Sequence, residues 1–389
     1  MHRLIAAACL LLTMAAAPAW AQLVPLRPHP EGVPWPTADW SVAAPAGVDA
    51  AGLAAAMSDA FDGKIPALGE TREVVIVQNG RLVYERYAPG YTPQTRLVSW
   101  SVAKSVTHAL VGVAAAQGRI DPDAPMGSPH WAAGDGRAAL SWRTWLNMVD
   151  GQRYLEIGAP SVTRSDAARK LFGPGRLDVA RWCAGLPMIH APGAVWNYNS
   201  CGIVLTADAL TRTVFPAPAD AAARRAAMLR WMREGLFDRI GMKTAQPEFD
   251  QTGLFYGSAL IYAPAREFAK FGYLYLRDGV WDGRRILPEG WVDFARTPGP
   301  AANTDGYGAG WWLNPATGPG KPRRVLMDAG RDGFSAQGHE GQIVLVIPSR
   351  DLVIVRMGLI AETPDAWDAL YDWVGRVGAL FPEAAAPPA

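Results

Sequence analysis

Runs of β-branched and alternating apolar residues predict strands near both ends of the chain. The first two strands are joined by Asn79-Gly80, the strongest short signal for a hairpin turn. The predicted strands are residues 73–78, 81–87, 306–313, 342–347 and 352–357. Because side chains alternate along a strand, Trp311 and Trp312 are expected on opposite faces of the third.

Apolar residues at helical spacing dominate the middle of the chain. The predicted helices are residues 48–61, 101–116, 142–148, 165–172, 178–184, 203–210, 221–235, 264–276 and 364–380. With strands at both ends and helices between them, we predict an α+β fold of the α/β-sandwich type, in which helices flank an antiparallel sheet. A mostly helical subdomain, about residues 119–257, is inserted, and the cleft between the two parts is the natural place for a ligand.

The first residues have the pattern of a secretory signal peptide over residues 1–21. Arg3 precedes the apolar run 4–17, and Ala19-Trp20-Ala21 is a small-residue cleavage site. We therefore expect cleavage near Ala21 and a periplasmic or secreted protein. The apolar run is too short for a stable anchor, and no other run suits a transmembrane helix.

The remaining boundaries follow from composition. Residues 22–47 are rich in proline and are expected as an extended lead-in to one large domain over 48–383. The Ala/Pro tail, residues 384–389, is expected to be disordered.

Composition and charge exclude some partners. The chain has 389 residues, half of them hydrophobic, and a formal net charge of +1, which disfavours nucleic acid as a partner. Removal of the signal leaves Cys183 and Cys201, for which a disulfide and two buried thiols are equally compatible with the sequence. No spacing of Cys and His resembles a metal site. The oligomeric state stays open.

The candidate nucleophile is Ser101, at the start of the helix predicted over 101–116. Lys104 lies three residues on, so both side chains share one face of that helix. A serine hydroxyl needs a base within hydrogen-bond reach, and a lysine can be that base when burial lowers its pKa. Backbone N–H groups at the helix start, including that of Ser101, can stabilise a developing oxyanion.

Two other stretches are expected to meet this pair at the cleft. In Tyr198-Asn199-Ser200, the Tyr198 phenol is a proton shuttle whose pKa we expect cations to lower, and Ser200 is expected to hold the Lys104 ammonium. In His339-Glu340-Gly341, the glycine would allow close approach of substrate to the strand edge. The backbone N–H of Gln342 would then complete the oxyanion hole.

In this order and spacing, the three motifs resemble the serine hydrolases of the class C β-lactamase and penicillin-binding-protein superfamily. The chain is most similar to the branch of 6-aminohexanoate-dimer hydrolase-like and family VIII esterase-like proteins. The resemblance covers roughly Trp35 to Leu380, including the phrases at 257–260 and 281–288. It implies an acyl-enzyme on Ser101, Lys104 and Tyr198 as general base and acid, and no metal or cofactor. It also implies an oxyanion hole formed by the backbone N–H groups of Ser101 and Gln342.

Two departures from the superfamily pattern shape the expected substrate. The second motif is Tyr-x-Ser instead of Tyr-x-Asn, and the third is His-Glu-Gly instead of Lys-Thr-Gly. Both favour a small-molecule ester or linear amide over a β-lactam. His339, Trp100 and Tyr154 are the expected substrate-contacting or pocket residues. A class C-type β-lactamase, a D-alanyl-D-alanine carboxypeptidase and a non-catalytic peptidoglycan-binding protein of the same fold are the alternatives.

Overall fold

The computed structural model describes residues 23–216, 220–301, 306–314 and 330–385. The predicted signal peptide, residues 1–21, lies outside this part of the chain. So do the last residues of the predicted tail, 386–389.

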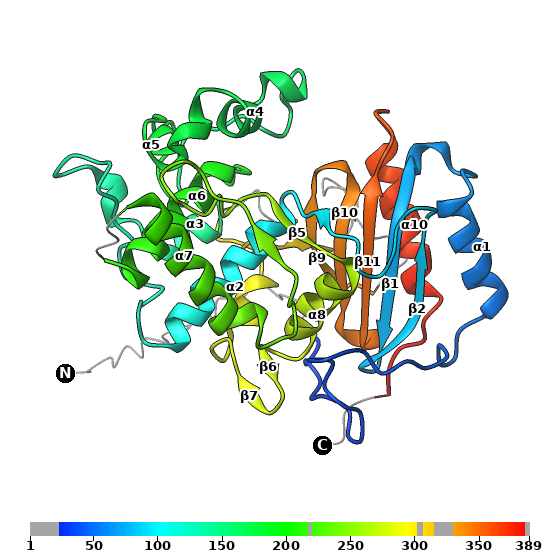
Figure 1. The fold of residues 1–389 in the computed structure, drawn as a ribbon. Helices are drawn as coiled ribbons and strands as arrows, with labels where there is room; N and C mark the ends of the chain where they lie inside the picture. The colour runs from blue at the N-terminus through cyan, green and yellow to red at the C-terminus, as the bar shows by residue number, and fades with distance from the viewer. Residues whose placement is uncertain (1–22, 217–219, 302–305, 315–329, 386–389) are drawn as a thin grey trace, which may run out of the picture.

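A six-stranded sheet takes its strands from two distant parts of the chain (Figure 1). Their order across the sheet is β2 (Arg81–Tyr87), β1 (Glu70–Gln78), β11 (Leu352–Leu359), β10 (Gln342–Ile347), β9 (Phe334–Gly338) and β8 (Trp312–Leu313). Every neighbouring pair is antiparallel. The fold is therefore a mixed one, with helices around an antiparallel sheet, and the predicted α+β class is confirmed.

Helices cover both faces of this sheet, and the alternation along β10 shows how. Its odd-numbered residues, such as Leu345, belong to a core cluster with residues of α1 (Ala50–Phe61) and α10 (Ala366–Ala379). Its even-numbered residues, such as Val344, belong to the cluster that contains α8 (Ala265–Leu276) and α2 (Val102–Ala116). A strand buried on both faces reads as a continuous apolar run, as residues 343–347 do.

The middle of the chain is mostly helical and lies beyond α2, away from the sheet (Figure 1). Its helices are α3 (Trp142–Leu146), α4 (Asp166–Leu171), α5 (Val179–Ala184), α6 (Ser200–Val214) and α7 (Ala221–Met232). A second, small sheet consists of β3 (Leu97–Val98), β5 (Ile261–Ala263) and β4 (Gln246–Pro247), in that order. The other strands and helices are the hairpin of β6 (Val280–Trp281) and β7 (Arg284–Arg285), the helix α9 (Trp291–Ala295), a π-helix over Arg233–Phe237 and short 3-10 helices.

The structure corrects several predicted bounds. Of the strand expected over 306–313, only Trp312–Leu313 pairs with the sheet. The residues before it, which include glycines at 306, 308 and 310, form a turn in which the N–H of Gly308 donates to the carbonyl oxygen of Trp311. The two tryptophans do separate: Trp311 packs against α8, and Trp312 stacks on Tyr198. The predicted helix 203–210 begins earlier, at Ser200, because Asn199 caps it.

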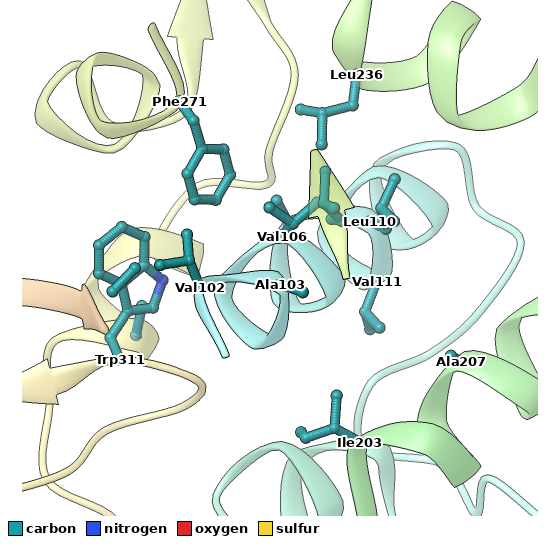
Figure 2. Packing of buried hydrophobic residues seen from close by; sticks show 14 of the residues in the cluster. Val102, Ala103, Val106, Leu110, Val111, Ile203, Ala207, Leu236, Phe271 and Trp311 are labelled. Carbon is teal, nitrogen blue, oxygen red and sulfur yellow. The ribbon is translucent and has the colours of Figure 1, made fainter. Parts of the chain in front are cut away.

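Helix α2 is the central element, and protein surrounds it on all sides. Every residue from Val102 to Ala114 is buried. Figure 2 shows its apolar side chains packed between Phe271 of α8, Ile203 and Ala207 of α6, and Leu236. A helix held in this way cannot rotate without breaking close packing on several sides. Whatever its first turn carries is therefore fixed in place.

We expect the sheet core to dominate stability. Leu345 has no exposed surface and packs between the sheet and α1 and α10, so Leu345→Ala should lower the free energy of unfolding by about 2 to 5 kcal/mol. Urea unfolding followed by circular dichroism measures the change. Val42→Ala is the control, because Val42 is 73% exposed and should change stability little. Equal effects of the two substitutions would contradict this account of the core.

Candidate active site

A sharp turn presents Ser101 at the start of α2. Strand β3 ends at Val98, and Trp100 then takes a left-handed backbone conformation with φ of 44° before Ser101 begins the helix. The Ser99 side chain holds this turn by accepting from the N–H of Ile261. Left-handed backbone is unfavourable for a bulky residue and tends to be retained at functional sites. The turn leaves Ser101 partly exposed on the wall of a cavity.

Lys104 touches the candidate nucleophile directly. Its Nζ donates to Ser101 Oγ at 2.6 Å and to the carbonyl oxygen of Ser258 at 3.1 Å. The lysine is 1% exposed, and burial lowers its pKa to about 8, although the charge of Glu156 works in the opposite direction. A substantial fraction of Lys104 is therefore neutral near pH 8, as a base must be.

Tyr198 lies against this pair, as the sequence predicted, but its pKa moves the other way. The Lys104 Nζ is 4.7 Å from the centroid of its ring. Burial raises the pKa of the Tyr198 phenol well above its usual value, and the charges of Tyr307 and Glu156 add to the rise, while hydrogen bonding with Ser101 opposes it. The expected lowered pKa is wrong, because loss of water around the phenol outweighs the nearby cation. Tyr198 is a neutral phenol in the resting site.

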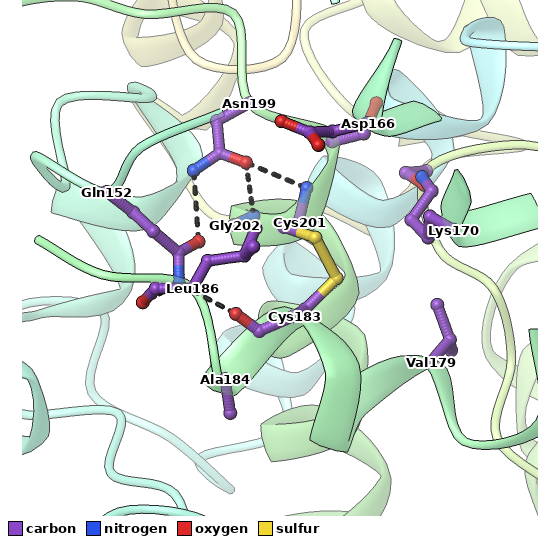
Figure 3. The surroundings of a disulfide bond; sticks show 12 residues. Gln152, Asp166, Lys170, Val179, Cys183, Ala184, Leu186, Asn199, Cys201 and Gly202 are labelled. Carbon is purple, nitrogen blue, oxygen red and sulfur yellow. Dashed lines mark hydrogen bonds between the residues drawn. A yellow bond between two sulfur atoms is a disulfide. The ribbon is translucent and has the colours of Figure 1, made fainter. Parts of the chain in front are cut away.

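Tyr198 is held from the end of a capped helix. The Oδ1 of Asn199 accepts from the N–H groups of Cys201 and Gly202 at the start of α6, and its amide donates to Gln152 (Figure 3). The same amide also donates to Asp150. Next to this cap, Cys201 forms a disulfide with Cys183 of α5, their Cα atoms 5.1 Å apart. The structure thus decides between the two states that the sequence left open for these cysteines.

Ser200 does not hold the Lys104 ammonium. Its Oγ donates to Glu156 Oε2 at 2.6 Å, and the position expected for it beside Lys104 is taken by the carbonyl of Ser258. The helix begins at Ser200, so its side chain leaves the backbone in another direction than an extended segment would give. Tyr154, which we expected to line the pocket, is buried and does not line the cavity at Ser101, and its hydroxyl has no hydrogen-bond partner among the described residues.

The third motif forms the turn between β9 and β10. It makes a hydrogen bond to the turn at residues 99–101 that presents Ser101 (the nucleophile turn). Trp100 Nε1 donates to Glu340 Oε2 at 2.8 Å, and the rings of Trp100 and His339 meet edge to face at 5.4 Å between centroids. Glu340 is left-handed as well, with φ of 63°. His339 and Glu340 both line the cavity next to Ser101, so His339 is positioned for contact with a ligand.

The expectations for Gly341 and Gln342 need correction. A Cβ on Gly341 would meet Ile360 at 2.4 Å and Arg356 at 2.7 Å, so this glycine faces the core instead of the cavity. The Gln342 side chain is buried against Gly358 of β11, bonding both its N–H and its carbonyl. Gly338, the β9 residue that pairs with Gln342, lies against the nucleophile turn instead. A Cβ on Gly338 would lie 2.2 Å from the carbonyl oxygen of Ser99. The strand backbone therefore reaches this turn at 338–339.

Three site residues were missed by sequence reasoning: Glu156, Lys170 and Ser258. Lys170 of α4 donates to Ser258 Oγ at 2.5 Å, so one serine accepts from both buried lysines. Burial and the charge of Lys104 lower the pKa of Lys170 to about 7. The chain has only six lysines, but the short helix predicted over 165–172 shows no pattern that would turn Lys170 inward. Nothing in the local sequence places it beside Lys104.

These residues surround a cavity of about 320 Å³. Its polar wall includes Ser101, Glu156, Lys170, Ser200, Ser258 and His339, and its rim includes Trp100, Val162, Leu171 and Phe172. Lys104 and Tyr198 do not line this cavity themselves, and Lys104 reaches it through its contact with Ser101 Oγ. A larger hollow of about 750 Å³ between Pro129 and Met188 contains none of the three motifs.

Comparison with known proteins places this site in a family. The family model for beta-lactamases matches residues 53–213 and 207–373, which span most of the chain. The chain belongs to the beta-lactamase family. It is a serine hydrolase of the beta-lactamase-like kind, as its motifs indicated.

Individual relatives agree with this membership. A 6-aminohexanoate-dimer hydrolase of Paenarthrobacter ureafaciens is 25% identical over 325 residues, covering 77% of this chain and 76% of that protein. A provisionally assigned 6-aminohexanoate-dimer hydrolase from Bacillus anthracis has the same fold, with a TM-score of 0.60, 23% identity and coverage of 80% and 81%. The penicillin-binding protein of Bacillus halodurans matches with a TM-score of 0.59 at 15% identity, over 85% of this chain and 100% of that chain.

The described residues contain no group of three or more His, Cys, Asp or Glu arranged to hold a metal ion. Within the same part of the chain, no helix has both the length and the apolar character needed to cross a membrane.

We expect the disulfide to stabilise the fold around Tyr198. Replacing both cysteines, Cys183→Ser with Cys201→Ser, should lower the free energy of unfolding by about 3 kcal/mol, because the bridge closes a loop of moderate length in the unfolded chain. Urea unfolding of the variant measures the loss. The same protein with a reducing agent is the control, since reduced wild type should then match the variant. A variant as stable as oxidised wild type would contradict the expectation.

Proposed function

We propose that the protein cleaves an ester or a linear amide through an acyl-enzyme on Ser101, with Lys104 and Tyr198 as base and acid. The observation that carries this proposal is the contact between Lys104 Nζ and Ser101 Oγ at 2.6 Å, inside a buried site that lowers the pKa of the lysine. A neutral amine at hydrogen-bonding distance is what a serine needs in order to attack a carbonyl carbon.

In the acylation step, Ser101 Oγ bonds to the carbonyl carbon as its proton passes to Lys104. The negative charge that forms on the carbonyl oxygen is stabilised by the N–H of Ser101 and by a backbone N–H of the strand end at 338–339. Tyr198 gives its proton to the leaving alcohol or amine and is reprotonated by the Lys104 ammonium. In deacylation, water attacks the ester of Ser101, and the same groups return the proton to Ser101 Oγ.

The relatives support a linear substrate. One is named for the hydrolysis of a 6-aminohexanoate dimer, and a structural neighbour is a D-stereospecific amidohydrolase from a Streptomyces species. Those activities belong to those proteins. In this chain, the replacement of a lysine by His339 in the third motif is the feature that favours linear esters and amides over β-lactams.

We further propose that the protein is exported to the periplasm or beyond. The signal-like pattern at residues 1–21 is one support. The second is the Cys183–Cys201 disulfide, since such bonds persist mainly in oxidising compartments.

Ser101→Ala should abolish turnover while the fold is retained. The assay is a panel of p-nitrophenyl esters, a linear amide dimer and a chromogenic cephalosporin, with the circular dichroism melt as a check on folding. Loss of activity should be at least about a thousandfold, because the nucleophile itself is removed. Ser58→Ala, on the surface helix α1, is the matched control. Ester cleavage at the wild-type rate by the Ser101→Ala enzyme would overturn the proposal, and cephalosporin cleavage alone would favour the β-lactamase alternative.

The reaction should depend on pH through Lys104. Because its folded pKa lies at about 8, the base is protonated at lower pH, and kcat/KM for a neutral ester should rise about tenfold per pH unit below 8 and level off above it. Lys104→Arg, which stays charged, should be inactive across the range. Stopped assays from pH 5 to 10 measure the profile. A flat profile between pH 6 and 9 would argue against a lysine base.

A further inference from the structure

Lys170 is a buried amine that the proposed reaction does not use, and an anionic ligand would favour its protonated form. It is 1% exposed, and in the described structure Ser258 Oγ is the one hydrogen-bond acceptor of its ammonium group. Burial and the charge of Lys104 lower its pKa to about 7, and the charge of Glu156 opposes this shift, although Lys170 and Glu156 form no ion pair among the described residues. An ammonium has three N–H donors, so most of the hydrogen-bonding capacity of Lys170 is unsatisfied.

Another buried basic group in this chain, Arg356, has many hydrogen-bond acceptors around it. The guanidinium of Arg356 is fully buried and donates to the carbonyl oxygens of Leu68 and Gly341 and to the hydroxyl of Thr71. A buried charge is normally surrounded by acceptors in this way, because desolvation is costly. Lys170 has no such surroundings, so folding alone does not account for a lysine at this position.

The position of Lys170 relates it to catalysis. It lines the same cavity as Ser101, and Ser258 connects it to the base: the Ser258 hydroxyl accepts from Lys170 and the Ser258 carbonyl accepts from Lys104. The ammonium group is thus a few atoms from the nucleophile. Between this group and the solvent, the cavity has apolar walls formed by Leu171, Phe172 and Val162, the last two each 62% exposed.

We propose that Lys170 binds a carboxylate at the far end of the acyl group, so that the enzyme prefers esters and amides of dicarboxylic acids. This inference rests on the proposed acyl-enzyme at Ser101. A carboxylate satisfies the free N–H groups of the ammonium, and short methylene chains suit the apolar walls. The buried end of the cavity fits the part of the substrate that stays attached to Ser101, because the leaving group must depart through the mouth.

The other charges around the cavity agree with this assignment. Glu156 is bonded to Ser200, and Glu340 to Trp100, so each carboxylate already has a donor. Neither one neutralises Lys170 by direct contact. The third motif carries His339 where the superfamily has a lysine, which leaves Lys170 and Lys104 as the lysines at this site.

The test compares ester pairs that differ only in the terminal group: monomethyl glutarate with methyl pentanoate, and monomethyl adipate with methyl hexanoate. Wild type should prefer the acid ester by about tenfold or more in kcat/KM, since a buried charge-assisted contact exceeds 1.4 kcal/mol. Lys170→Met should lose this preference, and Lys170→Arg should keep part of it. Arg169→Gln is the matched control, because Arg169 is on the same helix, exposed and paired with Asp166.

The outcomes separate the two proposals. If the esters are cleaved by wild type but not by Ser101→Ala, and the preference is the same in Lys170→Met and wild type, the carboxylate assignment is wrong and the proposed function stands. If Ser101→Ala cleaves the esters as well as wild type, the proposed function itself fails. A thermal melt checks the folding of Lys170→Met, and Lys170→Gln, for which the same loss is expected, replaces it if the melt falls below the assay temperature.

Discussion

The contact between Lys104 and Ser101 is the interaction on which the rest of the site depends. It requires a lysine that is buried enough to lose its proton and still fixed within hydrogen-bond distance of a hydroxyl. Helix α2 meets both requirements because its first turn is part of the core: the residues after Ser101 are packed from α6, α8 and the sheet side at once. The carbonyl of Ser258 then gives the amine a second oxygen, and this fixes its direction as well as its distance.

Two sets of local contacts hold distant parts of the chain next to Lys104 and Ser101. On the sheet side, Trp100 and Glu340 both have left-handed backbones, and a hydrogen bond between their side chains joins one turn to the other. On the helical side, the Asn199 cap and the Cys183–Cys201 bridge hold the segment that carries Tyr198. Each of these two sets involves only a few residues. Together they restrain the elements from both halves of the fold that meet at Lys104 and Ser101.

Much of the fold could be predicted because its signals are local. The Asn79-Gly80 hairpin, the apolar run at 342–347 and the helix after Ser101 all follow from short patterns. What sequence reasoning missed depends on packing at a distance. Lys170 and Glu156 lie in a segment of short helices and turns whose pattern does not say which side chains point inward. The partner predicted for Ser200 was wrong. Asn199 caps α6, so Ser200 is its first helical residue, and the direction of the Ser200 side chain depends on that cap.

Burial acts on the base and on the phenol in opposite senses, and this orders the proton transfers in the proposed reaction. It lowers the pKa of Lys104 and raises that of Tyr198, so both groups favour their neutral forms in the resting site. In the proposed reaction, this assigns the first proton transfer, from Ser101, to the amine of Lys104 and not to a phenolate. Once Lys104 is positively charged and the carbonyl oxygen negatively charged, the site contains an ion pair in a region of low dielectric. Passing a proton from the ammonium through Tyr198 to the leaving group removes that charge separation, and for this reason the phenol is needed late in the step instead of at its start.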